Sequence, residues 1–170
     1  MKVRIRISKK LYEAVLTDLR RPHLFAAERV GFLSAHLGRV SESEMVILLT
    51  AYISVPDDLY IEDYTVGARI NSEAIRRAMQ TVLDTGQSLY HVHLHDWTGS
   101  PGLSLTDQSE IPPIVKSLHN VGGASIPHGL IVFSRNKAYA LTSFSKEEEM
   151  VSARRISVVG HPFSFLESEL

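Results

Sequence analysis

The chain has 170 residues, of which 44% are hydrophobic and 22% are charged, a composition typical of one globular domain. Its net charge is -1 and it has no long basic run, so nucleic acid is a poor default partner. It contains no cysteine, which excludes a disulfide framework and a thiolate nucleophile and leaves His, Asp and Glu as ligands for any metal ion.

The first predicted elements are a strand and a helix. Apolar and charged residues alternate over residues 3–7, which predicts an edge-like strand with one face in solvent. Ser8 is a candidate N-cap for the following helix, which is expected to end near Pro22. The N-terminus lacks the uninterrupted apolar segment of a secretory signal, and no run approaches the roughly 20 apolar residues that span a bilayer. We therefore expect a cytoplasmic protein that does not contact membranes.

The middle of the chain predicts two strands and a second helix. Residues 30–40 have a strand-like pattern, and residues 45–55 form a continuous apolar run typical of a buried strand. An apolar stripe at helical spacing predicts a helix over residues 72–85. The candidate caps of this helix are Asn71 or Ser72 at its start and Gly86 at its end.

The rest of the chain completes an α+β pattern. A strand over residues 90–95 leads into a loop rich in Gly, Pro and Ser, and Thr106 is a candidate N-cap for a third helix. The later predicted elements are a hairpin over 130–134 and 137–143 and a final strand over 150–159. Since no internal repeat or linker is visible, we expect a single domain over residues 1–170, with a mostly antiparallel sheet flanked by helices.

Three histidines occupy alternate positions of the predicted strand in the sequence YHVHLHD. His91, His93 and His95 therefore share one face, with neighbours about 6.5 Å apart at Cα, close enough for two imidazoles to bind one ion. Asp107 follows after a tight loop and can add an oxygen ligand while leaving a fourth position for water. Such an open site is typical of catalytic zinc, and two histidines with one carboxylate also suit iron(II) or manganese.

The same residues carry a family resemblance. Glu28 in AERVGFL, His93 and His95 as His-x-His, and Ser104-x-x-Asp107 resemble the JAMM motif of the MPN (JAB/Mov34) metalloproteases. The spacing from Ser104 to Asp107 agrees with that motif, whereas eight residues instead of seven separate His95 from Ser104 and Asp96 stands in place of the usual proline. The segment looks most like the prokaryotic branch, whose members include proteins encoded beside E1-like enzymes and ubiquitin-like modifiers.

The resemblance implies an MPN/JAB-like (cytidine-deaminase-like) fold and a zinc-dependent, deubiquitinase-like isopeptidase. It implies that one Zn²⁺ is held by His93, His95 and Asp107 and activates a water. Glu28 would take the proton of that water as general base and return it to the leaving amine, while Ser104 would stabilise the oxyanion. The implied partners are a ubiquitin-like protein or its conjugates, and E1-like and E2-like enzymes of the same pathway.

Two other functions fit the same residues. One is a JAMM-type peptidase that acts on a sulfur-carrier protein or a small peptide, and the other is a catalytically inactive MPN scaffold. A scaffold has no need for the five motif residues together, so the motif favours an enzyme. The width of the cleft would distinguish an isopeptidase from a peptidase for smaller substrates, and loops set that width.

Residues around the motif have less specific predicted roles. His91, Asp96 and Trp97 are predicted to orient a ligand or to face the substrate, although a turn carboxylate and a packing indole are equally compatible with the sequence at Asp96 and Trp97. The loop over residues 55–67 is a candidate for the flank of the substrate site. His128, between Pro127 and Gly129, is expected to be structural or at the surface.

Overall fold

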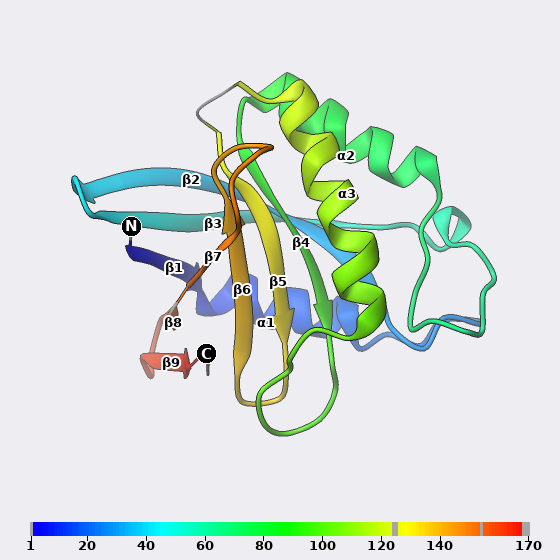
Figure 1. Ribbon diagram of the computed structural model, residues 1–170. Coiled ribbons are helices and arrows are strands. Elements are labelled where there is room, and N and C mark those ends of the chain that lie inside the picture. Colours follow the sequence, from blue (N-terminus) through cyan, green and yellow to red (C-terminus); the bar gives the residue numbers. More distant parts are fainter. Residues whose placement is uncertain (1, 124–125, 154, 168–170) are drawn as a thin grey trace.

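A computed structural model describes residues 2–123, 126–153 and 155–167 (Figure 1). These residues form strands and helices in an α+β arrangement. In chain order the elements are β1 (Lys2–Ser8), α1 (Lys9–Leu19), β2 (Val30–Ser41), β3 (Glu44–Ser54), the 3-10 helix η1 (Asp57–Leu59), α2 (Ser72–Thr85), β4 (Ser88–Leu94), α3 (Leu105–Val121), β5 (His128–Phe133), β6 (Ala138–Ser143), β7 (Val151–Ser152), β8 (Arg155–Val159) and β9 (Ser164–Glu167).

One sheet contains all nine strands of the described residues, in the order β7-β6-β5-β4-β2-β3-β1-β8-β9. Five of its eight strand pairs are antiparallel, and the pairs β1–β3, β1–β8 and β4–β5 are parallel. The predicted α+β class and mostly antiparallel sheet are therefore confirmed.

The helices cover the two faces of this sheet unequally. On one face α1 packs against apolar residues from strands across the sheet, among them Ile5, Tyr90 and Phe133. On the other face α2 and α3 pack against residues of β2, β4 and β5, among them Phe32 and Leu89. Figure 1 shows α2 and α3 together over this part of the sheet, with α1 behind it. Strand β4 lies between both helical layers, which explains why each of its residues is buried.

Local sequence signals explain where the helices begin and end. The Ser8 side chain accepts a hydrogen bond from the backbone N–H of Leu11, so the predicted N-cap of α1 is confirmed. Asn71, one of two candidates, caps α2 by accepting from two backbone N–H groups. Gly86 ends α2 with a left-handed φ of 63°, a conformation that glycine adopts without a Cβ clash.

Three expectations differ from the structure. Strand β1 has the expected wet face but lies between β3 and β8, so it is not an edge strand; alternation reports which faces are covered and not where a strand sits in the sheet. The strand predicted over 150–159 is divided into β7 and β8, because β7 pairs with β6 whereas β8 pairs with β1. The N-cap of α3 is Ser104 and not Thr106. None of the described helices is long and apolar enough to cross a membrane.

Candidate metal centre

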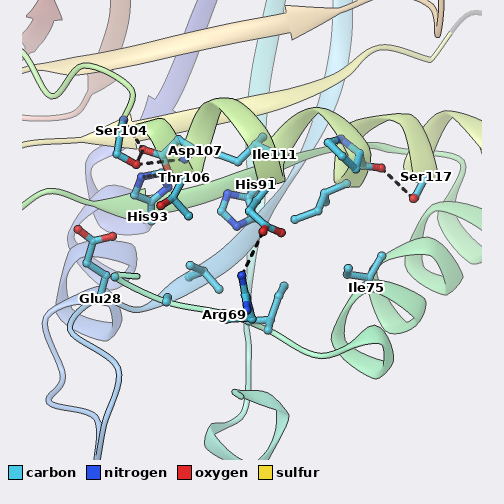
Figure 2. Close-up of a pocket in the computed structure, with 17 residues that line it drawn as sticks. Glu28, Arg69, Ile75, His91, His93, Ser104, Thr106, Asp107, Ile111 and Ser117 are labelled. Carbon is cyan, nitrogen blue, oxygen red and sulfur yellow. Dashed lines mark hydrogen bonds and ion pairs between the residues drawn. The ribbon is translucent and has the colours of Figure 1, made fainter. Parts of the chain in front are cut away.

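The histidines of β4 point toward α3. Leu89, His91 and His93 alternate with Tyr90 and Val92, whose side chains belong to the core under α1. The close-up in Figure 2 shows His91 and His93 side by side beneath α3, with His93 next to Asp107. The backbone N–H of His95 donates to the carbonyl of Phe133, which ties the first residue after the strand to the neighbouring β5. The pleat of β4 and this tether bring His93 and His95 to one place.

Four side chains meet where β4 ends. The Nε2 atoms of His93 and His95 are 3.2 Å apart, and Asp107 Oδ1 lies 3.2 Å from Nε2 of His93. His95 Nε2 lies 3.6 Å from the second oxygen of Asp107 and 3.8 Å from Oε1 of Glu28. Glu28, His93 and His95 can present one ligand atom each within 4.8 Å of one another, so this group could bind a metal ion.

These distances fit a tetrahedral ion. With zinc–nitrogen bonds of about 2.0–2.1 Å, the ligand atoms of a tetrahedral site lie about 3.3 Å apart. The 3.2 Å between Nε2 of His93 and Nε2 of His95 is close to that separation, and the two Asp107 contacts of 3.2 and 3.6 Å involve different oxygens of its carboxylate. The contact of Glu28 is the longest of the four. Two imidazoles and two carboxylates thus lie within reach of one point, and the group whose ligand atoms all lie within 4.8 Å of one another is Glu28, His93 and His95.

The tautomer of His95 is determined by a carbonyl. Nδ1 of His95 lies 2.6 Å from the oxygen of Pro101, and since a carbonyl can only accept, Nδ1 carries the proton and donates it. In the neutral ring Nε2 then carries the lone pair on the side of the cluster, where it lies 3.2 Å from Nε2 of His93, and a metal-ligating histidine needs this tautomer. The indole of Trp97 stacks on this ring at 4.5 Å and so restricts its orientation.

Ser104 holds Asp107 in place through a capping box. Its hydroxyl and its backbone N–H each donate to Oδ2 of Asp107 at 2.8 Å, and its Oγ accepts from the Asp107 backbone N–H at 3.0 Å. Burial raises the pKa of Asp107, but the hydrogen bonds from His93 and Ser104 outweigh it and keep that pKa well below its usual range. The Ser104 hydroxyl proton is thus directed at the carboxylate in this structure, a positioning contact that the sequence motif did not suggest.

Glu28 reaches the cluster from the loop before β2. Its backbone N–H donates to the Gly67 carbonyl at 2.9 Å, and a Cβ on Gly67 would lie only 2.6 Å from the Glu28 carboxylate. Gly67 therefore makes room for this side chain, which remains 29% exposed. Figure 2 shows the Glu28 carboxylate on the side of His93 and Asp107. The sequence did not indicate a role for Gly67, because its only signal is a glycine in a loop whose course the sequence does not predict.

Two hollows meet at Glu28. The first, of about 170 Å³, runs from His93 between α3 and the 67–70 segment, where Arg69 and Glu110 form a 3.4 Å ion pair (Figure 2). The second, of about 580 Å³, lies beyond Glu28 and is bounded by Trp97 and the C-terminal end of α1. Of the cluster residues, Glu28 lines both hollows, whereas His93 and Asp107 line the first.

No model of a known protein family matches the chain, and no curated protein matches its sequence.

The remaining predicted site residues lie around the cluster. His91 lines the first hollow and packs edge-on against Phe32, with ring centroids 5.7 Å apart, and burial, assisted by the neighbouring His93, lowers its pKa to about 3. Asp96 lies at the edge of the second hollow, where Arg135 and Arg20 both contact it. Arg135 holds down the pKa of Asp96, so this carboxylate stays charged. The geometry gives Asp96 no direct contact with the metal cluster.

Proposed function

We propose that the chain is a zinc-dependent metallopeptidase of the MPN/JAB type that cleaves the amide bond after the C-terminal tail of a ubiquitin-like protein. The observation that carries this proposal is the convergence of His93, His95, Asp107 and Glu28 from separate segments of the chain. These are the motif residues that resemble the family, and their side chains meet at ligand distances. The MPN-like identity of the fold is part of the same proposal.

The donor set fits zinc and an open site. His93 and His95 offer imidazole nitrogens and Asp107 one carboxylate, a set that neutralises only half of a dication. Bound to these ligands, Zn²⁺ would supply Lewis acidity and lower the pKa of a coordinated water toward 7. The capped Asp107 and the tautomer of His95 keep the protein side of the site arranged before any ion arrives.

Glu28 is suited to move the proton. Its carboxylate lies 3.8 Å from Nε2 of His95, a longer contact than those among His93, His95 and Asp107. Part of the Glu28 side chain is exposed to the two hollows. In the hydrolysis, the oxygen of a water forms a bond to the scissile carbonyl carbon and its proton goes to Glu28. The carbon–nitrogen bond then breaks, and Glu28 returns the proton to the leaving amine.

The two hollows supply room on both sides of the scissile bond. A flexible tail in extended form can lie along the hollow beneath α3, which is lined by Ile75, Ile111 and Ile114 among other residues. The leaving amine then faces the hollow beside Trp97. A peptidase acting on a sulfur-carrier protein or a small peptide would use the same residues, with a shorter leaving group.

A specific observation supports an alternative in which Glu28 is itself a ligand. It shares the metal-binding cluster with His93 and His95, and with Asp107 it would complete four protein ligands. A closed site of that kind is structural, as expected of an inactive scaffold. The longer separation of Glu28 from His95 favours the open site.

Metal content and hydrolysis of three proteins test the proposal. Wild type and Glu28→Gln are expected to bind about one zinc per chain and His95→Ala to bind none, as measured by inductively coupled plasma mass spectrometry. Only zinc-loaded wild type is expected to release the fluorophore from a ubiquitin-like tail amide. Loss of zinc in Glu28→Gln would favour the closed site, and a wild type that fails to load after a zinc soak would overturn the proposal.

A further inference from the structure

Within the described residues, no helix packs on strands β1, β8 and β9 on the side of α2 and α3. The described apolar residues packed beneath these helices come from β2, β3, β4, β5 and β6 and from the loops beside them, and none of them comes from β1, β8 or β9. Figure 1 shows β1, β8 and β9 on the part of the sheet away from α2 and α3. On this side, alternate residues of β1 are exposed while the others are buried under α1. The open face is therefore a distinct surface, three strands away from β4.

The strand register gathers cations on this open face. Lys2, Arg4 and Arg6 occupy the exposed positions of β1, at spacings of about 6.6 Å along the strand. Because Ile5 pairs with Ile156, Arg155 of β8 lies on the same face beside Arg4.

Only one of the four cations is neutralised by a carboxylate within the part of the chain that the structure describes. Arg4 contacts Glu44 at 2.6 Å, whereas Lys2, Arg6 and Arg155 form no ion pair there. Glu167 pairs with Arg155 in the β8–β9 register but does not line the hollow described next.

Two aromatic rings stand beside the cations. Phe163 and Phe165 are 52% and 46% exposed and pack edge to face with centroids 4.7 Å apart. The guanidinium of Arg155 lies over the Phe165 ring at 4.2 Å. Together with β1 and β8 these rings line a hollow of about 630 Å³. The residues around it are Lys2, Val3, Arg4, Arg6, Arg155, Ser157, Val159, Phe163 and Phe165.

We propose that this hollow, the basic aromatic face, binds single-stranded nucleic acid. Cations spaced along a strand neutralise successive phosphates, and exposed aromatic rings on an open sheet offer stacking surfaces for unpaired bases. The whole-chain charge of -1 does not oppose this, because strand alternation places the cations of β1 on one face without a basic run in the sequence.

Two features favour nucleic acid over other anionic partners. An acidic peptide would use the cations but would have no need for two half-exposed rings beside them. Side chains that bind an acidic membrane protrude from the protein surface, whereas these residues line a concavity. Each alternative predicts a different result in the test.

The test is a fluorescence anisotropy titration of the full chain with labelled single-stranded oligouridine and oligothymidine of about 12 nucleotides. At low salt we expect saturable binding with a Kd of about 1–100 µM, and a fall in log affinity with log salt of slope about -2 to -3, as for three or four phosphate contacts. Phe165→Ala is expected to weaken binding roughly 5- to 150-fold and Phe165→Tyr to restore it. Arg6→Ala is expected to reduce the magnitude of the salt slope by about 0.7.

Matched controls lie elsewhere on the surface. Lys10→Ala removes an exposed cation from α1, and Tyr64→Ala removes an aromatic ring that is 75% exposed, and neither is expected to change the affinity. Absence of saturable binding up to about 1 mM would overturn the proposal. So would equal binding by wild type and Phe165→Ala, or tighter binding of oligoglutamate or phosphatidylserine vesicles than of either oligonucleotide. Thermal melting of each variant verifies that these exposed substitutions leave the fold intact.

Discussion

Replacing Ser104 by alanine separates two roles for this residue. In the structure its Oγ makes two hydrogen bonds, one given to the Asp107 carboxylate and one accepted from the Asp107 backbone. Loss of an N-cap costs about 1 kcal/mol, and a hydrogen bond to a charged group contributes about 1.5–3 kcal/mol. Since the backbone N–H of Ser104 still donates to the same carboxylate oxygen, we expect Ser104→Ala to lower the free energy of unfolding by about 2 kcal/mol.

The same substitution is expected to weaken zinc binding. Removing a group that orients a metal ligand typically reduces metal affinity 10- to 100-fold, and Ser104 orients Asp107. Urea unfolding of the metal-free protein and competition with a chromophoric chelator measure the two effects. Ser109→Ala is the matched control, because it removes a hydroxyl hydrogen bond from the same helix at a residue that does not contact the cluster. Full zinc affinity in Ser104→Ala, with hydrolysis reduced about 100-fold, would refute the positioning role and favour an oxyanion donor.

Three further predictions concern neighbours of the site and a buried histidine. Gly67→Ala is expected to displace Glu28 and to reduce kcat at least 10-fold with unchanged zinc content, because the added Cβ overlaps the carboxylate; normal kcat would contradict this. His91→Asn is expected to keep about one zinc per chain, since His91 has no contact with the cluster ligand atoms, whereas His93→Asn is expected to lose it; equal zinc loss would make His91 a ligand. Burial lowers the pKa of His128 to about 4, so between that value and the unfolded pKa near 6.5 the unfolded chain binds more protons. The free energy of unfolding is therefore expected to have its full value above about pH 6.5 and to fall by up to about 3 kcal/mol toward pH 4. Urea unfolding of wild type and His128→Asn at several pH values measures this. The same dependence of the free energy of unfolding on pH in both proteins would refute His128 as the cause.

Local rules predicted the elements whose signals are contained in a few adjacent residues. Ser8 and Asn71 cap their helices because a side-chain oxygen next to the first turn satisfies free N–H groups. The alternation of the histidines in β4 predicted their common face, since successive side chains of a strand point to opposite sides. The third helix was predicted with the wrong cap, because Ser104 and Thr106 are both good caps and the loop path decides between them.

The surroundings of the metal cluster could not be predicted in the same way. Gly67 lies 39 positions after Glu28, and nothing in either local sequence indicates that a Cβ there would meet the carboxylate. The Pro101 carbonyl that orients His95 belongs to the loop between β4 and α3, whose course no local sequence pattern predicts. Contacts of this kind join residues whose separation in the chain is unrelated to their distance in space.

The sequence by itself determined the chemistry of this protein: which donors are present, which of them share a strand face, and where most helices begin and end. Those properties follow from side-chain type and from the periods of helix and strand. Only the tertiary structure decided that Glu28 meets His95 at 3.8 Å, that the Ser104 hydroxyl is directed at Asp107, and that β1 lies inside the sheet with its cations on an open face. These facts depend on strand order and on which surfaces the helices cover, and both are set by the burial of apolar area over the whole chain.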